Sequence, residues 1–141
     1  MKNLNTALFR AMERRDLRNY VFDYYRDKIQ NTTVVNKQTG ITINFNKVGR
    51  MKTSSLFASV EKSLIIIYLK EYLAEAKRIK TTEIKKGSSI DKNVPNSLFV
   101  INFLITASID DKPKKFVCGI IVKNDGKFQY SLYHLGITPK K

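Results

Sequence analysis

Hydrophobic and polar residues alternate along the last third of the chain and predict three β-strands. Apolar side chains recur at every second position of residues 97–108, which is the period of a strand with one buried face. The second strand, at 114–124, is apolar on both faces over residues 116–122, as expected of a covered central strand, and residues 127–137 form the third strand. Two groups of turn residues separate the strands: Asp110-Asp111-Lys112-Pro113 and Asp125-Gly126. The pattern predicts a three-stranded antiparallel meander.

The first two thirds of the chain carry a different period. Apolar residues of segments 4–30 and 56–79 recur at helical spacing, which predicts one or two N-terminal helices and one long helix that covers a face of the meander. Ser54 or Ser55 is the expected N-cap of the long helix. Between these segments, residues 32–36 and 41–46 predict a β-hairpin that turns at a glycine.

Residues 80–96 are rich in lysine and include a glycine, serines and a proline. Their composition predicts a surface loop with at most a short strand at 82–84. Together the elements predict one α+β domain over residues 1–141, with a helical N-terminal segment at 1–30 and an α+β core at 32–137. The helices are expected on one side of an antiparallel sheet.

The net charge of the chain narrows the range of expected partners. The chain has 26 Lys and Arg against 12 Asp and Glu, a net charge of +14, which favours a polyanion such as nucleic acid or an acidic protein as partner. Cys118 is the sole cysteine, so we expect neither a disulfide nor a thiol metal site. No signal peptide, membrane-spanning segment or cofactor-binding motif is recognisable. We therefore expect a cytoplasmic protein without metal or cofactor.

Two places offer candidate chemistry. The loop at 47–55 brings Arg50 and Lys52 next to a predicted helix start, where basic side chains, hydroxyls and helix amides can hold a phosphate; an ordinary capped helix start explains the same residues. His134 is the sole histidine and titrates near neutrality. By strict alternation it shares the face of Tyr130 and Leu132, so it also fits a histidine at the edge of the core.

The layout resembles a known superfold. Lys37-Gln38-Thr39-Gly40-Ile41-Thr42-Ile43 leads to a basic loop, a long helix with Ala74-Glu75-Ala76 near its end, a charged connector and a meander that closes with Tyr130 to His134. Over residues 37–135 this is similar to the phage and mobile-element branch of the barnase–EndoU–colicin–RelE-like nucleases. The resemblance implies metal-independent RNA cleavage by a phage or mobile-element protein inside a bacterial host cell.

Such cleavage needs proton transfer and stabilisation of the phosphoryl charge. His134 is the candidate proton-transfer residue, and Arg50 with Lys52 the candidate phosphate clamp. Tyr130 or Tyr133 are candidates to orient the nucleotide and Thr53 or Ser54 to bond the phosphate. These are the residues proposed for the site.

The chain departs from that branch in two places. It has Ser97-Leu98-Phe99 where the branch often carries a basic residue or histidine, and Tyr133-His134 where the branch often has an Asp-His pair. The competing hypothesis is therefore an inactive interaction module, such as a phage-encoded inhibitor of a host protein. The sequence favours RNA as the partner and leaves an acidic protein as the alternative.

Overall fold

The computed structural model describes residues 3–45, 59–88, 94, 96–124 and 126–137. The described strands form one seven-stranded sheet in the order β1-β5-β6-β7-β3-β2, with β4 paired to β5. Their bounds are β1 Asn3–Leu4, β2 Thr32–Val35, β3 Thr42–Phe45, β4 Lys77–Glu83, β5 Ser97–Ile109, β6 Lys112–Asn124 and β7 Phe128–Ile137. The predicted α+β class, hairpin and antiparallel meander are confirmed.

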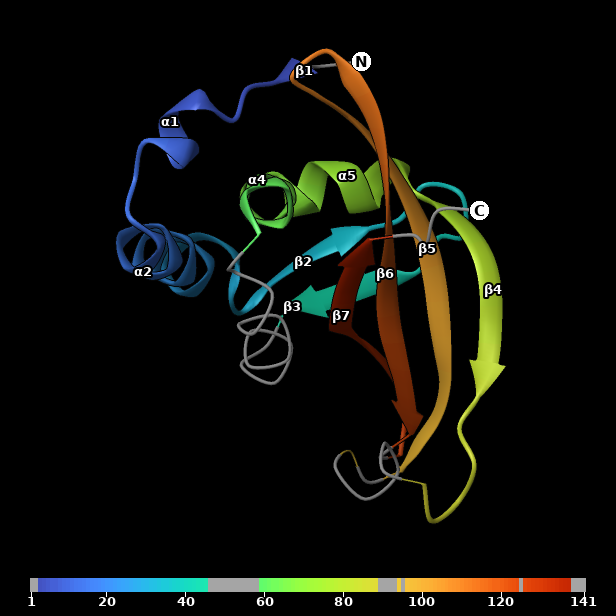
Figure 1. Ribbon diagram of the computed structural model, residues 1–141. Helices are drawn as coiled ribbons and strands as arrows, with labels where there is room; N and C mark the ends of the chain where they lie inside the picture. Colours follow the sequence, from blue (N-terminus) through green and yellow to red (C-terminus); the bar gives the residue numbers. More distant parts are fainter. Residues whose placement is uncertain (1–2, 46–58, 89–93, 95, 125, 138–141) are drawn as a thin grey trace.

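The described helices lie on one face of this sheet. They are α1 Ala7–Arg10, α2 Arg14–Tyr24, the π-helical turn η1 Tyr25–Ile29, α4 Val60–Ile67 and α5 Leu69–Glu75. Each contributes buried apolar side chains to one core, which also takes alternate residues of β5, β6 and β7 such as Phe103, Cys118 and Leu132. Figure 1 shows α4 and α5 beside the long middle strands, with α2 further out.

The predicted helix at 56–79 is wrong at its C-terminal end. Residues 56–58 and the proposed caps Ser54 and Ser55 lie outside the described residues; α4 begins at Val60, where Ser59 accepts a hydrogen bond from the Lys62 amide. Helical geometry is interrupted at Tyr68 (φ −106°, ψ 20°), and α5 ends at Glu75. The chain then becomes a strand.

That strand, β4, also corrects the prediction of a loop from residue 80. Lys77–Glu83 pairs antiparallel with residues 99–104 of β5, along the outer side of the sheet in Figure 1. All seven residues of β4 are exposed, so no alternation in the sequence marks them as a strand. Pairing with β5 overrides the helical spacing because it satisfies the backbone groups along that edge.

Asn36 connects the hairpin to the end of α5. Its fully buried side chain donates hydrogen bonds from Nδ2 to the carbonyls of Leu73 (2.7 Å) and Ala76 (2.9 Å). Its Oδ1 accepts from the Thr39 amide and hydroxyl. One side chain thus bonds both to the last turn of a helix, where carbonyls lack helical partners, and to a β-turn.

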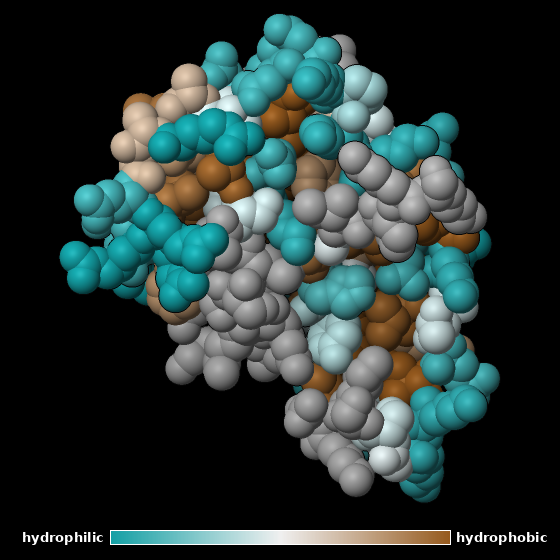
Figure 2. Space-filling model, in the orientation of Figure 1, coloured by the Kyte–Doolittle hydropathy of each residue, from teal (hydrophilic) through white to brown (hydrophobic). Residues whose placement is uncertain are grey.

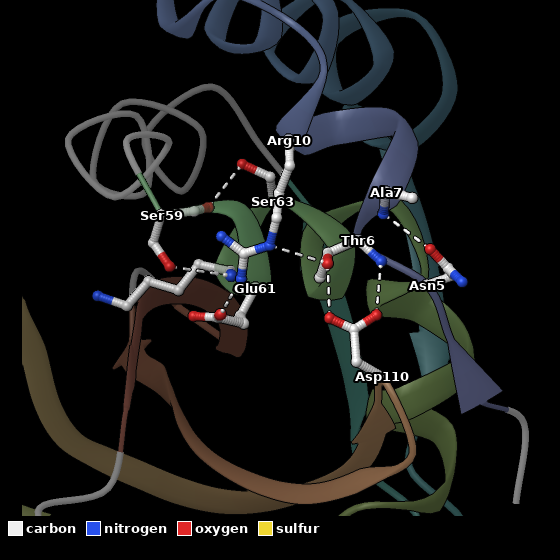
Figure 3. Close-up of polar contacts among 9 residues, drawn as sticks. Asn5, Thr6, Ala7, Arg10, Ser59, Glu61, Ser63 and Asp110 are labelled. Carbon is white, nitrogen blue, oxygen red and sulfur yellow. Dashed lines mark hydrogen bonds and ion pairs between the residues drawn. The ribbon is translucent and has the colours of Figure 1, made fainter.

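The N-terminal segment is attached to the turn between β5 and β6 (Figure 3). β1 pairs in parallel with Ser108 and Ile109. Asp110 accepts hydrogen bonds from the Thr6 hydroxyl (2.6 Å) and amide (3.0 Å), and these bonds hold the pKa of that carboxyl below its ordinary value. Arg10 donates to the Thr6 hydroxyl and to Glu61 of α4, so these hydrogen bonds connect the sheet to the helical layer.

Candidate nucleic-acid interface

A β-bulge decides where the histidine lies. In the β6–β7 ladder Gly119 pairs with His134 and Ile120 with Leu132, which leaves Tyr133 as an extra residue in β7. Both Leu132 and Leu135 are therefore buried in the core. The expectation that His134 shares the face of Leu132 is wrong, because the extra residue turns His134 to the opposite face.

Gly119 makes room for the imidazole. A Cβ at this position would lie 2.8 Å from Cε1 and 3.0 Å from Nδ1 of His134, closer than ordinary contact allows. The ring thus lies directly on the backbone of β6, a close approach that glycine permits in a strand interior. The Tyr133 ring is adjacent, with its centroid 5.7 Å from that of His134.

We call the side of the sheet opposite the helices the open face. It is formed by strand residues that alternate away from the core: Thr42, Asn44, Lys77, Lys80, Thr82, Val100, Asn102, Leu104, Thr106, Lys115, Val117, Gly119, Ile121, Lys123, Gln129, Ser131 and His134. One row of cross-strand partners joins Lys80, Asn102, Gly119 and His134 across four strands. The histidine therefore lies inside the sheet surface, not at its rim.

The charged side chains that the described strands place on the open face are all basic. Its ionisable side chains among the described residues are His134 and four lysines, at positions 77, 80, 115 and 123. The described strands place no Asp or Glu on this face. In Figure 2 hydrophilic residues follow the outer edge of the sheet, where β4 lies. This arrangement attracts anions.

Part of the open face is apolar and covered. Val100 and its cross-strand partner Ile121 lie on this face and are buried, and neither belongs to the main core. The accessible polar part is therefore the region around His134 and the lysines, together with the side towards β3.

The structure brings together only some of the predicted site residues. Tyr133 and His134 are adjacent, whereas Tyr130 is on the helix-covered face and packs against the core. Four other proposed site residues lie outside the described residues, so their roles remain predictions: Arg50, Lys52, Thr53 and Ser54.

The sequence interpretation did not identify the lysines of the open face or the glycine against which the imidazole packs. Lys115, Gly119 and Lys123 share one face of β6, a strand that the sequence predicts, so the period of a strand could have placed them together. Lys77 and Lys80 gave no such signal, because β4 was interpreted as a helix end followed by a loop.

Other chemistry receives little support from the described residues. Burial raises the pKa of the Cys118 thiol to about 12, so it is not a nucleophile. No group of three or more His, Cys, Asp or Glu side chains gathers there as metal ligands would. None of the helices described above combines the length and apolar character needed to span a bilayer.

Comparison with known proteins gives one match. Residues 12–130 match the family model described as large polyvalent protein-associated domain 3. The matched span includes four of the open-face strands and ends within β7, just before Tyr133 and His134. No curated protein and no solved structure shows significant similarity to the chain.

Proposed function

The chain belongs to the large polyvalent protein-associated domain 3 family, which associates it with phages and mobile elements, and within that setting we propose that it binds single-stranded RNA on the open face. The observation that carries the proposal is the open face itself, with four lysines, no described carboxylate and an imidazole at its centre. Lysines supply phosphate contacts, which provide most of the affinity for nucleic acid.

Single-stranded RNA fits this surface better than a duplex does. The deep, narrow major groove of an RNA duplex is closed to side chains, whereas an exposed sheet can hold unstacked bases against its side chains, and RNA sequences are mostly read in single strands. Amides and hydroxyls of Asn102, Thr82 and Thr106 lie between the lysines. They are able to bond bases or 2′-hydroxyls, while the lysines contact the phosphates.

The test is the salt dependence of binding to a labelled single-stranded RNA, measured by fluorescence anisotropy. If all four lysines contact phosphates, log Kd should change with log salt with a slope of about 3 in magnitude, or roughly 50-fold weaker binding at 200 mM than at 50 mM. The variant Lys77→Glu with Lys80→Glu should weaken binding about tenfold or more and reduce the slope by about 1.4.

A matched control reverses the same amount of charge elsewhere. Arg14 and Arg15 are exposed on α2, on the helical side of the molecule, so Arg14→Glu with Arg15→Glu should change affinity far less. Equal losses in the two double variants would mean that net charge alone attracts RNA, and the open face would then have no special role.

RNA cleavage is a second candidate, supported by the bulge that turns the imidazole towards the open face. In metal-independent cleavage the 2′-hydroxyl attacks the adjacent phosphorus, and a group such as His134 accepts or returns a proton. His134→Gln should lower turnover by about 10²- to 10⁴-fold while RNA affinity changes little. Turnover within about tenfold of the wild type would remove His134 from the reaction. Arg50 and Lys52 remain the proposed phosphate clamp, tested by Arg50→Ala.

The inactive interaction module predicts a different result. If the folded chain binds no RNA at low salt but retains a protein partner after nuclease treatment of a host lysate, the open face serves an acidic protein instead. Recovery that depends on intact RNA would support the present proposal.

A further inference from the structure

Strands β3 and β7 enclose a depression because they pair at one point only. Asn44 and Ser131 are the sole partners in this parallel ladder within the described residues, and residues on the N-terminal side of this pair in both segments line the depression. The depression has a volume of about 750 Å³, within the range of small-ligand sites. Its lining residues are Thr39, Gly40, Ile41, Thr42, Asn44, Lys127, Phe128, Gln129, Tyr130 and Ser131.

The lining offers side-chain hydrogen-bonding groups that other described residues do not use. Thr42 and Gln129 make no side-chain hydrogen bond to another described residue. The Asn44 Nδ2 donates to the Tyr130 carbonyl (3.1 Å), and no described residue donates to its Oδ1. By strand alternation these three polar side chains belong to the open face. Hydroxyl and amide groups combine donors with acceptors, as the edge of a nucleobase does.

The other groups of the depression suit the rest of a nucleotide. The Phe128 side chain is 58% exposed and lines the depression from the opposite face of β7, the face of Tyr130, where it provides an aromatic surface. Lys127 precedes it and is the one residue of the described lining that is charged at neutral pH. The described lining residues include no carboxylate, so they suit an anionic or neutral ligand better than a cation.

We propose that this depression binds one nucleobase of the RNA, with Thr42, Asn44 and Gln129 at the base edge and Lys127 at the adjoining phosphate. The inference rests on the proposed RNA binding and adds a base-selective subsite to it. Ser131 of the lining is three residues before His134 on β7, or roughly 10 Å along the strand. A base held here would direct its own strand of RNA across the imidazole.

The experiment uses the four nucleoside 5′-monophosphates as probes, with ribose 5-phosphate as the control that lacks a base. Nitrogen–proton NMR spectra of the full chain report on the side-chain amides of Asn44 and Gln129. We expect saturable shifts of both amides with one base preferred, and none with ribose 5-phosphate. Gln129→Ala should weaken binding of the preferred nucleotide about 3- to 10-fold, as loss of one hydrogen bond does, without lowering the melting temperature.

The outcomes separate this inference from the proposed function. If ribose 5-phosphate shifts the two amides as strongly as the nucleotides do, or if nucleotides shift only distant residues, the subsite is refuted, while salt-dependent RNA binding by the lysines would still stand. If nucleotides bind here but RNA affinity does not depend on Lys77 and Lys80, the subsite stands and the lysines of β4 lose their proposed role in RNA binding. If Gln129→Ala unfolds the chain, the comparison of the nucleotides with ribose 5-phosphate on the wild-type chain still tests the subsite.

Discussion

Replacing Gly119 by alanine tests the position of the imidazole directly. The new Cβ would lie 2.8 Å from Cε1 of His134, so the ring must withdraw by about 0.6–1 Å to reach ordinary contact. Overpacking of this kind costs about 1–3 kcal/mol. The ring is only partly buried and is able to swing outward, so we expect Gly119→Ala to cost about 1 kcal/mol, or a melting temperature lower by about 3–4 °C.

The sign of the effect should reverse when the ring is removed. Gly119 does not have a positive φ, so its backbone accepts alanine, and a glycine-to-alanine change in a strand then stabilises by about 0.5–1 kcal/mol. In a His134→Ala background Gly119→Ala should therefore be neutral or stabilising. A double-mutant cycle measured by urea denaturation gives the coupling, which we expect to be about 1–2 kcal/mol.

A second measurement follows the ring itself. Because His134 is the sole histidine, one imidazole Hε1 signal appears in the NMR spectrum, and Gly119→Ala should shift it. Gly136→Ala is the matched control, since a Cβ there meets nothing within 4 Å. No coupling in the cycle, or equal signal shifts in the two alanine variants, would refute the register with Tyr133 in a bulge and the placement of His134 on the open face.

Three further predictions concern the scaffold. Asn36→Ala should destabilise by about 2–4 kcal/mol in urea denaturation, because it leaves buried carbonyls of α5 without their donor; a loss under 1 kcal/mol would show that the connection is dispensable. The Asp110 pKa is lowered in the folded state, so its stabilisation is present above the ordinary carboxyl pKa and is lost as pH falls through the lowered value. Asp110→Asn should therefore lower the melting temperature at pH 6, and the difference from the wild type should disappear as the pH falls through the lowered pKa; a difference that stays constant with pH would contradict the hydrogen bonds between Thr6 and Asp110. Cys118, with its pKa raised to about 12, should resist iodoacetamide at pH 8 until the chain unfolds, as read by mass spectrometry, and rapid alkylation of the folded chain would contradict its burial.

The meander could be predicted from the sequence because its strands are buried on a regular period. Phe103 and Cys118 belong to runs in which every second residue enters the core, so burial and sequence carry the same signal. β4 left no such signal, since each of its side chains is exposed. Its strand conformation comes from a partner more than fifteen residues away, which no local pattern encodes.

The candidate site was predictable only in part. His134 was found because no other imidazole exists in the chain, but its face depended on one extra residue in β7. Leu132 and Leu135 are three positions apart, an odd spacing for two core residues of one strand, and this spacing is the signal that a bulge lies between them. The grouping of Lys80 with His134 required the order of four strands, which is a property of the sheet and not of any segment.

The parallel contact of β3 with β7 has a consequence for synthesis on the ribosome. The hairpin of β2 and β3 is made early, yet the strand that it joins comes after every other described strand, and Asn44 must wait for Ser131. β1 likewise pairs with the far end of β5, so part of each margin of the sheet is formed by a segment that emerged long before its partner. Contacts of such separation slow folding. A nascent chain that ends before β7 would hold its hairpin and helices without a sheet to join, exposed to chaperones and proteases until the last strand arrives.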